Sequence, residues 1–262
     1  MKKFFEPIII ILSVYTRIPM PMVYWNSSNL RYAFCFLPAA GLAVGAVQAA
    51  WAALCCAFGL SPLFGAVVMC AVPLLVTGGI HMDGFSDTID ALSSHAERQK
   101  KLEIMDDPHM GAFGAMWMIV YMMLCAASYY EILDAAEAGY FDIPTLTILL
   151  LAIPVISRAL TAFAISRIQP SKNKGMLYTF TSASDMKAVA AAAVVVSIIA
   201  AAALVLVSPI FALICTFLVI LLFAYFRRMT MKQFGGISGD LCGWLIQMTE
   251  LLLLAAVALY LQ

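Results

Sequence analysis

Seven long runs of apolar residues constrain the fold of this chain more than any other feature of its sequence. A helix needs about 20 apolar residues to cross a bilayer, and it satisfies its backbone hydrogen bonds internally. With 64% hydrophobic and 11% charged residues, the chain is too apolar for a soluble domain, where apolar usage is about 45–50%. We predict one all-α domain over residues 1–262, an integral membrane bundle of about seven transmembrane helices. The runs cover residues 32–58, 61–79, 112–132, 144–166, 186–207, 210–226 and 240–261.

A shorter apolar segment, residues 4–14, follows Lys2 and Lys3. It is not followed by the small residues of a signal-peptide cleavage site. We therefore expect a retained N-terminal helix that lies in the membrane interface or is half inserted, with a partial span as the lesser alternative.

Basic residues occupy alternate loops between the apolar runs. The loops near 59–61, 133–143 and 208–209 contain no Lys or Arg, whereas every Lys and Arg except Arg158 lies in the segments on the other side or, as Lys187 does, at their edge. By the positive-inside rule, we expect a multi-pass protein of the cytoplasmic membrane with a cytoplasmic N-terminus and an external C-terminus. The formal net charge is +0, and we expect membrane lipid rather than nucleic acid as a partner.

The best candidate for a site directly follows the second apolar run. Asp83, Asp87 and Asp90 are spaced i, i+4 and i+7, so in a helix they share one stripe on the predicted cytoplasmic side. Like charges at this spacing repel one another unless a cation lies among them. Carboxylate oxygens suit Mg²⁺, which completes its coordination with water and phosphate oxygens. The alternative is a solvated helix face. Gly78 and Gly79 precede the stripe and predict a break that frees backbone groups beside it.

A second acidic motif lies in the loop after this stripe. Glu103 and Asp107 are four residues apart, and Pro108 disfavours helix at Asp107. The motif suits a second metal ion or a substrate hydroxyl. The alternative is a plain helix end in which neighbouring lysines pair with Glu103.

A glycine-rich loop leads into the last apolar run. It reads Gly235-Gly236-Ile237-Ser238-Gly239-Asp240, and exposed backbone N–H groups ahead of a helix can bind an anion. The alternative is that Asp240 simply caps the helix.

Three ionisable residues near or within the apolar runs need separate interpretation. Arg158 and Glu250 each lie roughly 12–15 Å along their helices from the basic loops, so they are plausible partners. Such a pair is either functional or purely structural. His81 stands inside the first acidic motif, where we expect a hydrogen-bonding neighbour rather than a base. No Cys/His cluster predicts zinc.

Taken in order, these motifs resemble those of cobalamin synthase, the adenosylcobinamide-GDP ribazoletransferase family. The resemblance runs from about residue 10 to 255, and it includes the 15–19 and 37–41 segments. Asp106, Pro108 and His109 depart from the usual pattern, which leaves open whether Asp106 or Asp107 would contact a metal ion. The matching residues are Thr77-Gly78-Gly79-Ile80-His81, Asp83-Gly84 with Asp87 and Asp90, Glu103-Ile104-Met105 with Asp107, Gly111 and Gly114, Arg158, and Gly235-Gly236 with Ser238-Gly239-Asp240.

The resemblance implies a Mg²⁺-dependent membrane transferase. The ribose 3′-hydroxyl of α-ribazole, or of its 5′-phosphate, would attack the cobinamide phosphorus of adenosylcobinamide-GDP. GMP would leave, and adenosylcobalamin or its 5′-phosphate would form. Asp83, Asp87 and Asp90 would hold the metal, and Glu103 and Asp107 would complete its site or orient the hydroxyl. Substrate would be held by Gly78, Gly79, His81, Arg158, Gly235, Gly236, Ser238 and Asp240.

Two other functions compete with this interpretation. A CDP-alcohol phosphatidyltransferase would share the Asp-Gly-x-x-Asp pattern, but the continuation that it requires does not follow Asp87. A cation-coupled secondary transporter would place acidic residues near the bilayer midplane within paired repeats, and no repeat is evident. The sequence leaves open the oligomeric state, a homo-oligomer included.

Overall fold

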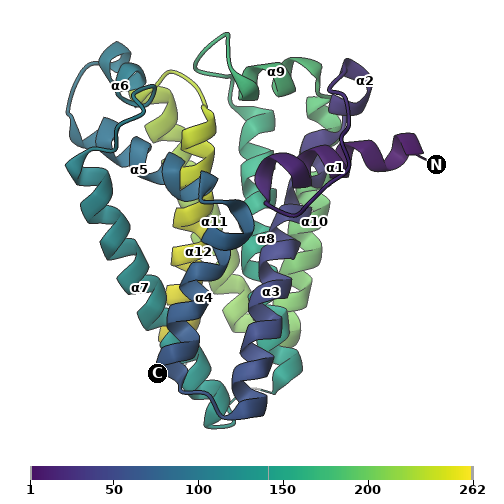
Figure 1. The fold of residues 1–262 in the computed structure, drawn as a ribbon, viewed down its shortest axis with the longest axis vertical. Helices are drawn as coiled ribbons and strands as arrows, with labels where there is room; N and C mark the ends of the chain where they lie inside the picture. Colours follow the sequence, from purple (N-terminus) through teal and green to yellow (C-terminus); the bar gives the residue numbers. More distant parts are fainter. Residues whose placement is uncertain (1, 141, 261–262) are drawn as a thin grey trace.

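The computed structural model describes residues 2–140 and 142–260 of the 262-residue chain. Within these ranges the regular elements are all helical, which confirms the predicted fold class (Figure 1). In chain order they are α1 (Lys2–Tyr15), α2 (Ser27–Leu30), the 3₁₀ turn η1 (Ala33–Phe36), α3 (Leu37–Phe58), α4 (Pro62–Thr77), α5 (Ile80–Ser93), α6 (Arg98–Ile104), α7 (Ala112–Glu137), α8 (Ile143–Arg167), α9 (Met176–Ala183), α10 (Met186–Val207), α11 (Pro209–Gln233) and α12 (Gly239–Tyr260).

The helices that could cross a membrane agree with the apolar runs of the sequence. In the described part of the chain six helices are long and apolar enough, and the count reaches seven if the bent pair α4 and α5 is taken as one span. The second run differs from a simple span, because its helix ends at Thr77 and the next helix leaves at an angle of 97°. The chain is therefore a multi-pass membrane protein in which one span ends in a sharp turn.

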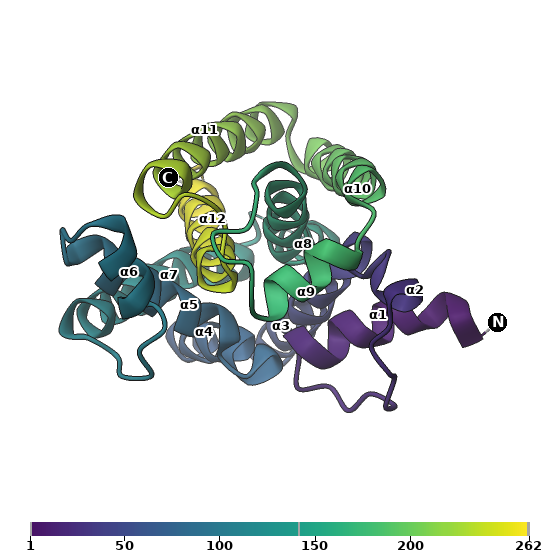
Figure 2. The same ribbon diagram turned by 90° about the horizontal axis from the view of Figure 1, so that it is seen from above.

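The short helices and the long loops gather at one end of the bundle, opposite the C-terminus (Figure 1). We call this the basic end, because its segments carry Arg17, Arg31, Arg98, Lys172 and Arg228. In both views α1 lies across this end rather than along the bundle (Figures 1 and 2). That placement is the one expected of an interfacial helix.

Tight turns connect the helices at the opposite end. Asp142 and Ser208 each accept a backbone N–H from the first turn of the following helix, as does Ser61. Proline follows within two residues of each cap, where its missing N–H costs nothing. These caps allow neighbouring spans to run antiparallel with short connections.

Helix α8 lies near the centre of the bundle, where α3, α10, α11 and α12 pack around it (Figure 2). It is 78% buried over its apolar window, compared with 22% for α11. Helix α3 approaches it closely, since a methyl group at Gly41 or Gly45 would collide with the backbone of α8 at Pro154 or Leu150. In lipid the hydrophobic effect does not drive helices together, so their association depends on close packing. Small residues such as these glycines allow that packing, because they let two backbones approach.

Candidate active site at the basic end

The break between α4 and α5 positions the acidic stripe. Gly78 ends α4 with φ of 70°, and Gly79 begins α5 with φ of 82°. Two successive left-handed residues are strained for any side chain but glycine. The predicted helix break is thus confirmed, and it turns α5 across the basic end instead of deeper into the bundle (Figure 1).

Acidic side chains from two helices meet at α5. Asp83 and Asp87 line one cavity, and the first turn of α12 packs against the same helix, with the Asp240 backbone directly over Gly84. Burial raises the pKa of Asp87 to about 7, and the negative charges of Asp83, Asp240 and Asp90 add to the rise. The raised pKa shows that the negative charges of this cluster repel one another, and a bound cation would relieve that repulsion.

Asp90 turns its carboxylate toward the next loop. Its two oxygens accept the backbone N–H groups of Gly111 and Gly114 at 2.8 and 2.9 Å. A side chain at Gly114 would meet both Asp90 and Ser86. Asp90 therefore anchors the start of α7, where an anion is also favoured by the helix dipole.

The cavity beside the stripe has a volume of about 970 Å³. Its polar side combines Asp83, Asp87 and Asp107 with Arg17 and Ser86. The hydroxyl of Ser86 is buried and lacks a hydrogen-bond partner among the described residues. The remaining wall comes from the glycine break and from apolar side chains, namely Leu74, Leu75, Gly78, Gly79, Ile80, Met82, Pro108, Met110 and Met118.

The second acidic motif divides between two environments. Asp107 lines the cavity and accepts the His109 backbone N–H at 2.9 Å, with the His109 ring nitrogen Nδ1 at 2.7 Å. These contacts lower the pKa of Asp107. Glu103 is instead paired with Lys100 at 3.1 Å, outside the cavity lining. The neighbouring Asp106 is paired with Lys172 at 2.6 Å.

His81 is buried behind the cavity rather than exposed in it. Its ring stacks on Tyr15 at 5.8 Å between centroids, and Nε2 has no hydrogen-bond partner among the described residues. Burial, with a contribution from the charge of Arg158, lowers its pKa well below the usual value. His81 is therefore neutral, and the expected hydrogen bond is not present at Nε2.

The glycine-rich loop before α12 is tied to another loop. Ile237 donates its N–H to the Gln169 carbonyl at 2.8 Å and accepts that of Ser171 at 2.9 Å. Gly236 packs directly against this segment, and Gly235 has φ of 77°. The Ser238 hydroxyl accepts the Leu241 N–H at 3.2 Å and so caps α12. This loop does not line the cavity, although it delivers Asp240 to α5.

Comparison with known proteins shows the family to which this chain belongs. The family described as cobalamin-5-phosphate synthase matches residues 7–258. The chain belongs to that family. Two relatives are named adenosylcobinamide-GDP ribazoletransferase. The one from Lachnoclostridium phytofermentans is 32% identical to this chain, and the match covers 98% of this chain and 95% of the relative. The one from Geobacillus kaustophilus is 31% identical, and the match covers 97% of this chain and 95% of the relative. No solved structure matches the chain significantly.

Family membership confirms the resemblance inferred from the motifs and the expectation of a transferase in cobalamin synthesis. It selects this function over the phosphatidyltransferase and transporter alternatives. The residue roles that the resemblance implies stay predictions. The geometry separates the acidic residues into two groups. Asp83, Asp87 and Asp107 line the cavity, whereas Glu103 does not.

The buried charges form a pair, as their equal depth predicted. Arg158 and Glu250 are 1% and 4% exposed and are joined by an ion pair between α8 and α12. Ser157 bridges them, since its hydroxyl donates to Glu250 at 3.1 Å and lies 2.9 Å from the Arg158 guanidinium. Neither charged side chain lines the acidic cavity, so Arg158 lies outside the candidate site in this protein.

Arg17 is the site residue that reasoning from residue chemistry missed. Its backbone N–H binds the Val76 carbonyl at 2.7 Å, and its side chain lies over Gly78. A single arginine in an N-terminal loop has no periodic signal that could reveal this contact. Only the resemblance of the 15–19 segment pointed to it.

The donor set fits Mg²⁺ held by few protein ligands. Among the described residues, no three His, Cys, Asp or Glu side chains are placed to hold a metal ion by themselves. Mg²⁺ commonly takes one or two carboxylates and fills its other positions with water and substrate phosphates. Asp83 and Asp87, one turn apart beside an open cavity, meet that requirement.

Proposed function

We propose that this chain transfers the cobinamide phosphate group of adenosylcobinamide-GDP to α-ribazole or its 5′-phosphate. The observation that carries the proposal is the cavity at the basic end. Two carboxylates of one helix line it together with Arg17, beside a broad apolar wall. The distribution of Lys and Arg supports a cytoplasmic position for this end, where nucleotides are available. On that topology the C-terminus is external and the protein lies in the cytoplasmic membrane.

Asp83 and Asp87 would hold one Mg²⁺ ion, which neutralises and aligns the pyrophosphate oxygens when it is bound. Their shared helix face fixes the spacing of the two carboxylates. Arg17 supplies a permanent positive charge on the same cavity and is suited to bind phosphate oxygens. Together these side chains would position the phosphorus for attack.

Asp107 would accept the hydrogen bond of the attacking 3′-hydroxyl. Its carboxylate lines the cavity and is kept ionised by the contacts from His109. A new bond would form between the ribose 3′-oxygen and the cobinamide phosphorus, while the bond to GMP breaks. This role differs from that of Glu103, which is paired with Lys100.

The apolar wall would receive the corrinoid. Methionine side chains adapt to irregular ligands, and Met82, Met110 and Met118 all line the cavity. The volume of about 970 Å³ lies near the upper end of small-molecule sites, roughly 300–1,000 Å³. A nucleotide-linked corrinoid is larger than this, so part of it would lie outside the cavity on the basic end.

The test measures GMP release by the full-length protein in detergent with adenosylcobinamide-GDP, α-ribazole 5′-phosphate and Mg²⁺. Asp87→Asn should lower kcat at least 100-fold, whereas Glu103→Gln, a matched loss of a nearby carboxylate, should retain most activity. Metal-independent turnover or an undiminished Asp87→Asn variant would refute the metal site. No GMP release by folded wild-type protein would refute the reaction itself.

A further inference from the structure

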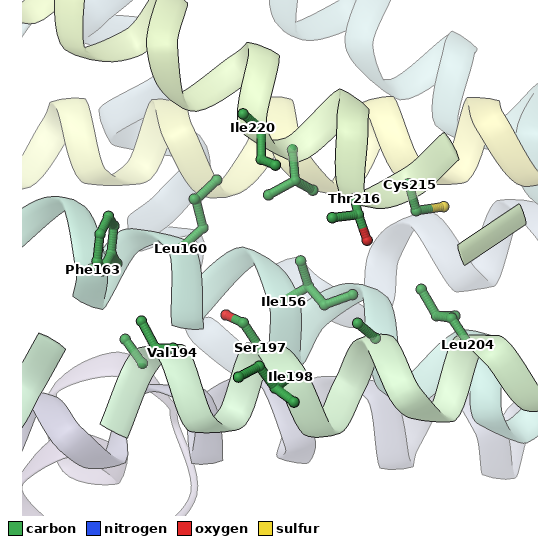
Figure 3. A pocket seen from close by; sticks show the side chains of 13 residues that line it. Ile156, Leu160, Phe163, Val194, Ser197, Ile198, Leu204, Cys215, Thr216 and Ile220 are labelled. Atoms are coloured by element: carbon green, nitrogen blue, oxygen red, sulfur yellow. The ribbon is translucent and has the colours of Figure 1, made fainter. Parts of the chain in front are cut away.

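A second hollow lies away from the acidic cavity, between α8, α10 and α11. Its volume is about 400 Å³ and its lining is almost entirely apolar. Figure 3 shows side chains of the three helices converging on it. Those that define its sides are Ile156 and Leu160 of α8, Val194 and Ile198 of α10, and Thr216 and Ile220 of α11. We call it the apolar groove.

The apolar groove runs along the middle and far part of α10. It extends on this helix from Ala193 to Leu204, a rise of about 16 Å. It begins six residues, about 9 Å of helix, beyond Lys187. The hydrocarbon core of a bilayer is about 30 Å thick, so the groove lies at a depth where acyl chains are available to fill it.

Next to the apolar groove, on the side of the basic end, lies a hollow of about 460 Å³. Val194 lines both spaces, and the second one is also lined by Ser166, Arg167 and Lys187. Arg167 follows Phe163 by one helical turn, and its guanidinium lies 5.3 Å from the centre of that ring. The two hollows thus adjoin at Val194, and we call the pair the channel, with the cationic hollow as its mouth.

The cations at the mouth have no acidic partner. Neither Arg167 nor Lys187 forms an ion pair within the described part of the chain, and both are exposed. The nearest acid in sequence, Asp185, is already bound to Arg31 at 3.1 Å. An anionic group arriving at the mouth would find two positive charges that nothing else neutralises.

We propose that this channel is a binding site for one phospholipid with an anionic headgroup. Its phosphate would lie between Arg167 and Lys187, and one acyl chain would occupy the apolar groove. The proposal is carried by the charge of the mouth, the apolar lining of the groove and the wall that the two hollows share at Val194. It is independent of the reaction proposed for the acidic cavity.

The test titrates delipidated full-length protein in detergent with phosphatidylglycerol and counts bound lipids by native mass spectrometry. One lipid should bind tightly. Arg167→Gln with Lys187→Gln should weaken its binding about fivefold for each charge, about 30-fold together. Arg227→Gln with Arg228→Gln, two charges at the same end but outside the channel, is the matched control and should leave the affinity unchanged.

A second variant probes the apolar groove without changing the charge. Ala201→Phe places a ring in the groove and should also remove the tightly bound lipid. Equal affinity for phosphatidylcholine would overturn the headgroup assignment, and displacement of the lipid by glycerol 1-phosphate alone would reassign the mouth to free phosphate. A dimer that forms without lipid and is abolished by Ala201→Phe would give the groove to a second copy.

Discussion

At the scale of single residues, Asp87 has the most informative chemistry. Its folded-state pKa of about 7 lies above the ordinary value of 3.8, so the metal-free protein binds a proton that the unfolded chain releases. The metal-free protein should therefore lose stability as the pH rises from about 4 to about 7. Mg²⁺ competes with that proton and should stabilise the protein more at pH 8 than at pH 6.

Thermal unfolding in detergent at several pH values, with and without Mg²⁺, measures this effect. Asp87→Asn should remove the pH dependence of the Mg²⁺-induced shift in Tm, because the amide cannot titrate. Glu103→Gln serves as the control and should retain it. A shift in Tm that is equal at pH 6 and pH 8 in the wild type would contradict the prediction.

Asp90 should affect folding more than metal binding, since both of its oxygens are used by backbone N–H groups. Asp90→Asn replaces one acceptor oxygen by a donor that faces an N–H. Hydrogen bonds to charged groups contribute about 1.5–3 kcal/mol, and we expect a loss of that order in unfolding free energy. The Mg²⁺ concentration giving half-maximal activity should change little in the fraction that remains folded. A large rise in that concentration with unchanged stability would make Asp90 a metal ligand instead.

At the scale of elements, the hinge between α4 and α5 decides where the acidic helix points. Gly79 has φ of 82° and no atom within 4 Å of the position of an added methyl group. Gly139, in a turn at the opposite end, has φ of 83° and is equally open. Replacing either glycine by alanine should lower the free energy of unfolding by about 1–2 kcal/mol through backbone strain alone.

This matched pair separates strain from function. Gly79→Ala should lower GMP release well beyond its effect on Tm, because α5 carries the carboxylates that face the cavity. Gly139→Ala should lower Tm similarly and leave the activity of the folded protein intact. If both variants lose activity in proportion to stability, the hinge has no special role in orienting α5.

The sequence could predict this hinge but not what α5 contacts beyond it. Hydropathy and length located the spans, and consecutive glycines before the aspartates predicted the break, because both signals are local. The close crossing of α5 and α12 is not local, since it depends on Gly84 lying under Asp240 and on Gly243 lying against His81. The entry of Asp107 into the cavity was open before the fold was known for the same reason. The pairing of Glu103 with Lys100 is local, since the two are three residues apart, and it was one of the two alternatives that the sequence offered.

At the scale of the whole molecule, the ion pair between Arg158 and Glu250 joins the two most buried spans, α8 and α12. Its depth was predictable from helix rise, but its role was not. The pair lies outside the acidic cavity and is bridged within the bundle by Ser157, although the Arg158 Nε has no hydrogen-bond partner among the described residues. We therefore expect it to secure the packing of α8 against α12 rather than to bind substrate.

A comparison of a single and a double variant tests this structural role. Arg158→Met alone leaves Glu250 buried without its partner and should cost about 3–5 kcal/mol of stability. Arg158→Met combined with Glu250→Leu removes both charges and should recover most of that loss, because well-packed apolar side chains often replace a buried pair without cost. Unfolding in detergent gives the stabilities, and GMP release gives the function. If the double variant is as stable as the wild type yet has a greatly raised KM for adenosylcobinamide-GDP, then Arg158 binds substrate as the family resemblance implies.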